Sequence, residues 1–73
     1  MATLRLKTPK QFGASLRAHR KIQAQSLKTV AEKLGVSISI VSQWECGLRY
    51  PNVRNLHKLT KYTGRTFAEL LYK

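Results

Sequence analysis

The chain has 73 residues, which leaves room for one small domain and no second one. A domain of this size buries only roughly 60% of its unfolded surface, so an elaborate enzyme active site is not expected. Fourteen Lys and Arg against three Asp and Glu give a net charge of +11. Such an excess is typical of proteins that bind polyanions, with nucleic acid as the leading candidate. At 42% hydrophobic residues, the chain is too apolar for a disordered basic tail.

The number of cysteines and the lack of long apolar stretches indicate the cellular compartment. Cys46 is the single cysteine, so no internal disulfide can form, which favours a reducing environment. No apolar stretch approaches the roughly 20 residues of a membrane-spanning helix, and residues 1–10 lack the apolar core of a signal peptide. We therefore expect a cytoplasmic, nucleoid-associated protein with no membrane partner.

The sequence offers no constellation for catalysis. His19 and His57 are far apart, and neither has a carboxylate or thiol at metal-ligand spacing. A lone Cys46 beside a loop is more often inert than nucleophilic. We expect no enzymatic activity, no catalytic residue, no metal and no cofactor.

After a short N-terminal arm at 1–8, a first helix is predicted over about 9–23. Thr8 is a suitable N-cap, Pro9 fits the first helical position, and Gln11 can close a capping box. Apolar or aromatic residues then recur every three or four positions. The residues with this spacing are Phe12, Leu16, His19 and Ile22.

Two short helices should follow. Ser26 can cap the first of them and Gly35 can end it. Its inner face would be Leu27, Val30, Ala31 and Leu34. Residues 38–45 contain a β-branched run that favours a strand by propensity. We predict a helix there, with Val41 and Trp44 inward and Gly47 as terminator, because a lone strand would have no pairing partner.

Two further helices complete the predicted fold. Asn52 can cap a fourth helix that ends at Gly64, and Thr66 with Glu69 forms a second capping box. Short connections between these helices indicate an all-α, five-helix compact bundle, with residues 9–73 as a single domain. The inward residues would be Val53, Leu56, Leu59, Thr60 and Tyr62 in the fourth helix, and Phe67, Leu70 and Leu71 in the fifth.

Residues 27–46 resemble the helix-turn-helix of the phage Cro and repressor family, also called the Xre family. Ala31 stands where that family needs a small residue, and Gly35 occupies its turn, where a β-carbon would cost about 1 to 2 kcal/mol. The other matching positions are Val30, Leu34, Val36, Val41, Trp44 and the exit loop through Pro51. With the five-helix order, the resemblance extends over about 9–71 and implies the lambda-repressor-like fold.

The chain departs from the family at three positions. Leu27 replaces a Gln that commonly braces a phosphate, which puts one phosphate contact in doubt. His19 and Gln25 stand where related sequences usually carry leucine, so the edge of the core should be more polar.

The resemblance implies a sequence-specific regulator of transcription that binds double-stranded DNA, with repression by occlusion of RNA polymerase as the leading expectation. It would act as a homodimer, stable in solution or formed only on DNA, on a palindromic operator with half-sites about one helical turn apart. The dimer surface would be the region after Pro51 or the last helix with Tyr72. The alternatives are a restriction-modification controller, which can activate, and an antitoxin or adaptor that mainly holds a partner protein such as a toxin.

The second helix of such a motif reads base edges in the major groove. Gln43 can pair bidentately with adenine, or be solvated surface. Ile38 can pack on thymine methyl groups, or be core or a dimer contact, and Ile40 is assigned to packing. Ser37 is an N-cap, a DNA contact or both. The base-reading candidates are Ser37, Ile38, Ser39, Ser42 and Gln43.

Phosphate contacts should come from free N–H groups at the start of the 27–34 helix and from cations around the groove. Asn52 can donate to a phosphate, although capping is the safer assignment. The candidates are Ser26, Leu27, Lys28, Arg49, Asn52 and Arg54, with Lys10, Arg17 and Lys21 reaching flanking phosphates.

The resemblance also places Arg20 and Glu45 opposite each other, as a partly buried ion pair that orients the recognition helix. The alternative is two unrelated surface charges. If the pair is buried, Glu45→Ala should cost about 3 to 5 kcal/mol, because Arg20 would be left uncompensated.

Overall fold

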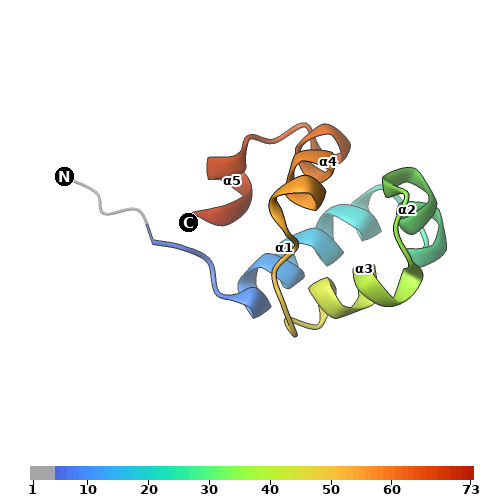
Figure 1. Ribbon diagram of the computed structural model, residues 1–73, viewed down its shortest axis with the longest axis horizontal. Coiled ribbons are helices and arrows are strands. Elements are labelled where there is room, and N and C mark those ends of the chain that lie inside the picture. The colour runs from blue at the N-terminus through green and yellow to red at the C-terminus, as the bar shows by residue number, and fades with distance from the viewer. Residues whose placement is uncertain (1–4) are drawn as a thin grey trace.

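The computed structural model describes residues 5–73. The helices are α1 (Pro9–Ile22), α2 (Leu27–Leu34), α3 (Ile38–Glu45), α4 (Val53–Thr63) and α5 (Phe67–Leu71) (Figure 1). Helix α1 packs against α3, α2 packs against both α3 and α4, and α5 packs against α4. The predicted all-α, five-helix architecture is confirmed. None of the helices in residues 5–73 has the length and apolar composition needed to cross a bilayer.

Local side-chain chemistry sets the helix boundaries. Each N-cap side chain accepts a hydrogen bond from the N–H three residues further on, which satisfies a donor that the helix itself leaves free. Gly35 and Gly64 end α2 and α4 in the left-handed region. Helix α1 ends at Ile22, one residue short of the prediction. The N-caps are Thr8, Ser26, Ser37, Asn52 and Thr66, of which Thr8 and Thr66 form full capping boxes.

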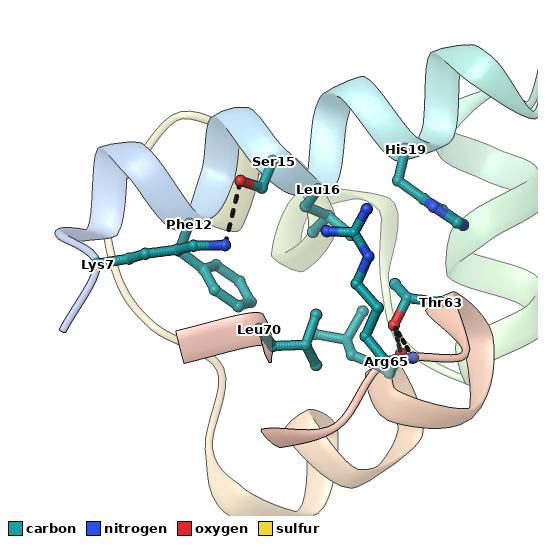
Figure 2. Close-up of a pocket in the computed structure, with 9 residues that line it drawn as sticks. Lys7, Phe12, Ser15, Leu16, His19, Thr63, Arg65 and Leu70 are labelled. Atoms are coloured by element: carbon teal, nitrogen blue, oxygen red, sulfur yellow. Dashed lines mark hydrogen bonds between the residues drawn. The ribbon is translucent and has the colours of Figure 1, made fainter. Parts of the chain in front are cut away.

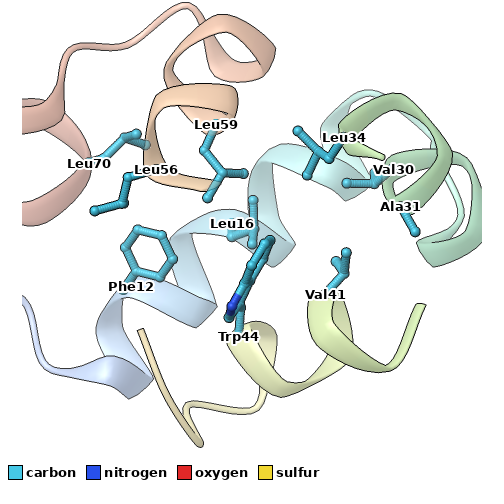
Figure 3. Packing of buried hydrophobic residues seen from close by; sticks show 10 residues of the cluster. All are labelled: Phe12, Leu16, Val30, Ala31, Leu34, Val41, Trp44, Leu56, Leu59 and Leu70. Atoms are coloured by element: carbon cyan, nitrogen blue, oxygen red, sulfur yellow. The ribbon is translucent and has the colours of Figure 1, made fainter. Parts of the chain in front are cut away.

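The core lies where α1, α3 and α4 meet, with α2 and α5 closing its two ends (Figure 3). Trp44 is its largest buried side chain, so the interpretation of Trp44 as a core residue is confirmed. Ile40 packs against the same cluster from its margin. The buried members are Phe12, Leu16, Val30, Ala31, Leu34, Val41, Trp44, Leu56, Leu59 and Leu70.

Two residues predicted to face inward, Val53 and Phe67, are exposed, and so is Ile22, which belongs to the apolar spacing of the first helix. Ile22 is 80% exposed, Val53 76% and Phe67 41%. Ile22 is the last residue of α1, while Val53 and Phe67 are the first residues of α4 and α5. The apolar period runs to each helix end, but the neighbouring helices leave much of these terminal side chains uncovered.

The expected N-terminal arm is tied to the fold over part of its length. The Lys7 N–H donates to the Leu71 carbonyl (2.6 Å), and the Lys73 N–H donates to the Arg5 carbonyl (2.9 Å). Leu6 bridges to Tyr72 in antiparallel fashion. Residues 5–7 therefore run beside the chain end rather than project as a free arm, while residues 1–4 of the predicted arm lie outside the described residues.

A crevice opens on the core between the start of α1 and the connection from α4 to α5 (Figure 2). Phe12, Leu16 and Leu70 form apolar walls, and Lys7 and Arg65 supply cations at its edge. Lys7 Nζ lies 3.3 Å from the Glu69 carbonyl and 3.5 Å from Ser15 Oγ. The cavity of about 10 Å³ holds no more than about one water molecule.

Candidate nucleic-acid interface

Helix α3 presents an uncharged surface over its first turns. Ser37, Ile38 and Ser39 are exposed, while Ser42 is half-buried. Ser37 Oγ accepts the Ile40 N–H at 3.1 Å, so this hydroxyl serves as the cap. Ile38 is 47% exposed, which excludes a role in the core. An apolar side chain thus lies open to solvent at the start of a polar helix.

Gln43 is less exposed to solvent than the sequence predicts. The residue is half-buried, and its Oε1 atom is shielded from solvent without a hydrogen-bond partner among residues 5–73. A buried acceptor left unpaired costs about 1 to 3 kcal/mol. Rotation of the carboxamide outward would relieve that cost, because it would give the acceptor access to water or to another donor.

The start of α2 offers backbone donors. Ser26 Oγ accepts the Thr29 N–H at 3.1 Å. The N–H groups of the first helical turn, at Leu27 and Lys28, have no acceptor within the helix, and the helix dipole favours an anion there. The Leu27 side chain packs against the core, so only its backbone can contact a phosphate. Lys28 is exposed beside it.

Cations surround these two elements without acidic partners. Within residues 5–73 the only ion pair joins Arg20 and Glu45, so the other cations remain uncompensated. Asn52 caps α4 through Oδ1, which accepts the Asn55 N–H at 2.8 Å, and its amide N–H₂ stays available. The exposed cations among the predicted phosphate contacts are Lys10, Arg17, Lys21, Lys28, Arg49 and Arg54.

The expected ion pair between Arg20 and Glu45 is present, and it is bidentate. Arg20 Nε lies 2.7 Å from Glu45 Oε2, and Nη2 lies 2.9 Å from Oε1. Their side chains are 12% and 6% exposed. The hydrogen bonds to Glu45 raise the pKa of Arg20 above its usual value. The pair fixes the last residue of α3 to α1 and removes Arg20 from the cations free to meet DNA.

Two glycines permit a close approach that the sequence analysis missed. A Cβ at Gly13 would lie 2.6 Å from the Glu45 carbonyl oxygen and closer still to that of Trp44. A Cβ at Gly47 would lie 2.8 Å from the Lys10 Cα. The first turns of α1 therefore sit directly on the end of α3. The available signal was Gly13 itself, because an isolated glycine inside a helical pattern often marks tight packing.

A helix with an exposed, uncharged surface, supported by a second helix across a glycine turn and surrounded by unpaired cations, defines a helix-turn-helix DNA-binding domain. A family model described as "Helix-turn-helix" matches residues 15–70, and the chain belongs to this family. The family and the fold are those of DNA-binding transcription regulators rather than of enzymes. Among residues 5–73, no three His, Cys, Asp or Glu side chains gather as a metal site.

Known proteins resemble the chain in sequence and in structure. It is 34% identical over 61 residues to the HTH-type transcriptional activator BcrR of Enterococcus faecalis, covering 84% of this chain but only 30% of BcrR. The P22 c2 repressor, solved in complex with synthetic operator 9T, is similar at TM-score 0.78 and 33% identity, over 82% of this chain and 91% of that one. The clp gene regulator ClgR from C. glutamicum follows at 0.73 and 25%, over 88% and 83%. The resemblance to the Cro and repressor family is thereby confirmed.

Proposed function

We propose that this chain is a sequence-specific regulator of transcription that binds double-stranded DNA by inserting α3 into the major groove. The observation that carries the proposal is the uncharged, outward surface of α3 flanked by unpaired cations. The major groove, about 12 Å wide, admits one helix with its side chains. Residues 9–73 would act as one DNA-binding domain, with 27–46 as the helix-turn-helix.

Base reading is assigned to the exposed side of α3. The half-exposed Ile38 can pack on thymine methyl groups, and such burial would offset its exposure in the free protein. Gln43 can rotate its unpaired carboxamide to adenine, where both amide atoms find partners. Ser37, Ser39 and Ser42 supply short hydroxyls that can contact either base edges or phosphates.

Phosphate binding is assigned to the elements on both sides of α3. The N–H groups that follow Ser26 at the start of α2, with Lys28, would hold one phosphate, as helix N-termini do. Arg49, Asn52 and Arg54 would hold another at the start of α4. Lys10, Arg17 and Lys21 would reach flanking phosphates from α1.

We further propose that two copies bind a palindromic site and repress by excluding RNA polymerase. Val53 and His57 are four residues apart on α4 and so share one side of that helix. His57 stacks on Phe67 of α5, with ring centroids 6.2 Å apart. This exposed stripe of Val53, His57 and Phe67 offers apolar area to a second copy. One structural neighbour, the P22 c2 repressor, is named as a repressor, and its structure was solved in complex with a synthetic operator.

Selection of bound duplexes from a random pool tests this function. We expect an enriched motif with two-fold symmetry and half-sites about 10 base pairs apart. Gln43→Ala should relax discrimination at one base position by about 1 to 3 kcal/mol. Lys61→Ala, on the far end of α4, is the matched control and should leave the motif unchanged. A pool that yields no preferred sequence would contradict the proposal and favour a module that mainly binds a partner protein.

A further inference from the structure

A small polar cluster lies where the connection between α1 and α2 meets α4. The Tyr62 hydroxyl donates to Gln25 Oε1. The rings of His19 and Tyr62 meet edge to face, with centroids 5.1 Å apart. His19 and Gln25 therefore both contact the same tyrosine, and the three side chains form one cluster.

The cluster is joined to the end of the recognition helix by further hydrogen bonds. Arg20 Nη1 donates to the Gln25 carbonyl at 2.9 Å, while the other guanidinium nitrogens hold Glu45. A continuous path thus runs from Tyr62 on α4, through Gln25 and Arg20, to Glu45 at the last residue of α3. Burial raises the pKa of Tyr62 above its usual 10.0, so its hydroxyl remains a donor at neutral pH.

The same connection determines where α2 begins. Ala24 has φ of +55°, in the left-handed region that favours glycine. Gln25, which follows it, immediately precedes Ser26, the N-cap of α2. Two hydrogen bonds hold Gln25 in place. The Tyr62 hydroxyl donates to its side-chain Oε1, and Arg20 donates to its backbone carbonyl. These bonds hold a strained turn in place beside the phosphate-binding start of α2.

We propose that Gln25 and Tyr62 are positioning residues for DNA recognition. They hold the start of α2 and the end of α3 in one fixed relation, so that the phosphate contact and the base-reading side chains engage the duplex together. Neither residue belongs to the set proposed to touch DNA. This inference rests on the proposed function, because it concerns discrimination between duplexes rather than folding alone.

Two minimal variants and their combination test the proposal. Tyr62→Phe removes only the hydroxyl, and Gln25→Met removes its acceptor at similar length. Dissociation constants are measured for the selected duplex and for one with a single mismatch, after circular dichroism has shown each variant to be folded. We expect each single change to weaken binding to the selected duplex by about fivefold, with less effect on the mismatched one. The double variant should bind the selected duplex as tightly as whichever single variant binds it less tightly. Ser15→Ala, which removes a hydroxyl on α1 that lies 3.5 Å from Lys7 Nζ, is the control and should bind as the parent does.

The outcomes separate this inference from the proposed function. If the parent protein does not distinguish the two duplexes, the proposed function is wrong. If the parent distinguishes them and Tyr62→Phe does so equally well, the positioning role is overturned. Losses that are equal on both duplexes, or that add up independently in the double variant, overturn it as well, since a purely structural contact would behave in that way.

Discussion

Arg20 and Glu45 form the one ion pair in residues 5–73, and both side chains are largely withdrawn from water. Burying two charges is costly, and their attraction repays that cost only with good geometry and further hydrogen bonds. The pair meets both conditions, because its contact is bidentate and the remaining guanidinium nitrogen is bonded to the Gln25 carbonyl.

The first prediction concerns Glu45. Glu45→Ala should lower the free energy of unfolding by about 3 kcal/mol or more, because it leaves a largely buried guanidinium without its opposite charge. Urea unfolding measures the change. The double variant Arg20→Met, Glu45→Leu is the control and should recover most of the loss, since it replaces both charges with apolar side chains of similar size. A loss below about half a kcal/mol, the range of ordinary surface substitutions, would show that the pair is not buried.

Single residues differ in how far the sequence reveals their roles. Ser26, Asn52 and Thr66 were predicted as caps because a cap acts over three residues, and the pattern contains both partners. The Tyr62 to Gln25 hydrogen bond spans 37 positions, and no local pattern encodes it. The sequence did mark Gln25 and His19 as unusual, although their common partner appeared only in the fold.

Helices α1 and α3 combine packing of buried side chains with direct backbone contact. Gly13 lies against the last carbonyl groups of α3, and Gly47 lies against the first turn of α1. The two glycines and the ion pair between Arg20 and Glu45 therefore help to orient the recognition helix on α1.

The second prediction tests the close contact between Gly13 and the end of α3. Gly13→Ala should cost about 2 kcal/mol or more, because the new methyl group meets backbone atoms that cannot move aside. Gly64→Ala is the matched control: its φ is +71° but nothing lies within 4 Å of the added Cβ, so only the backbone penalty of about 1 kcal/mol remains. Fluorescence of the single tryptophan, Trp44, can follow unfolding of both variants. A Gly13→Ala variant no less stable than Gly64→Ala would refute the close approach.

The sequence predicted where the helices begin and end more accurately than it predicted which of their residues are buried. Residues 38–45 form a helix although Ile38, Ile40 and Val41 favour strand, because tertiary contacts override weak local preferences. Val53 and Phe67 were predicted to face inward, and Ile22 belongs to the apolar period of α1, yet all three are exposed. Whether a terminal residue is covered depends on the length of the neighbouring helix, which the residue's own periodicity does not contain.

For the whole molecule, the net charge of +11 raises the question of which cations contact DNA. One Arg is neutralised by Glu45, and the rest occupy several sides of the bundle. Arg54 and Lys61 are both exposed on α4, near its opposite ends. They lie seven residues apart, or about 10 Å along the helix axis at 1.5 Å per residue. That separation is close to the Debye length of about 10 Å at 0.1 M salt. A phosphate bound by Arg54 should therefore be largely screened from the charge of Lys61, and the two cations should differ in their effect on DNA binding.

The last prediction concerns the dependence of DNA binding on salt. Each cation that contacts a phosphate releases counterions, so the logarithm of affinity falls with the logarithm of salt concentration by about 0.9 per contact. Arg54→Ala should therefore reduce the slope by about 1 and weaken binding to all duplexes alike. Lys61→Ala removes the same charge from the same helix and should leave the slope unchanged, with at most a small loss of affinity at low salt. Equal changes of slope in the two variants would mean that DNA responds to total charge alone, and the phosphate contacts assigned to the start of α4 would be wrong.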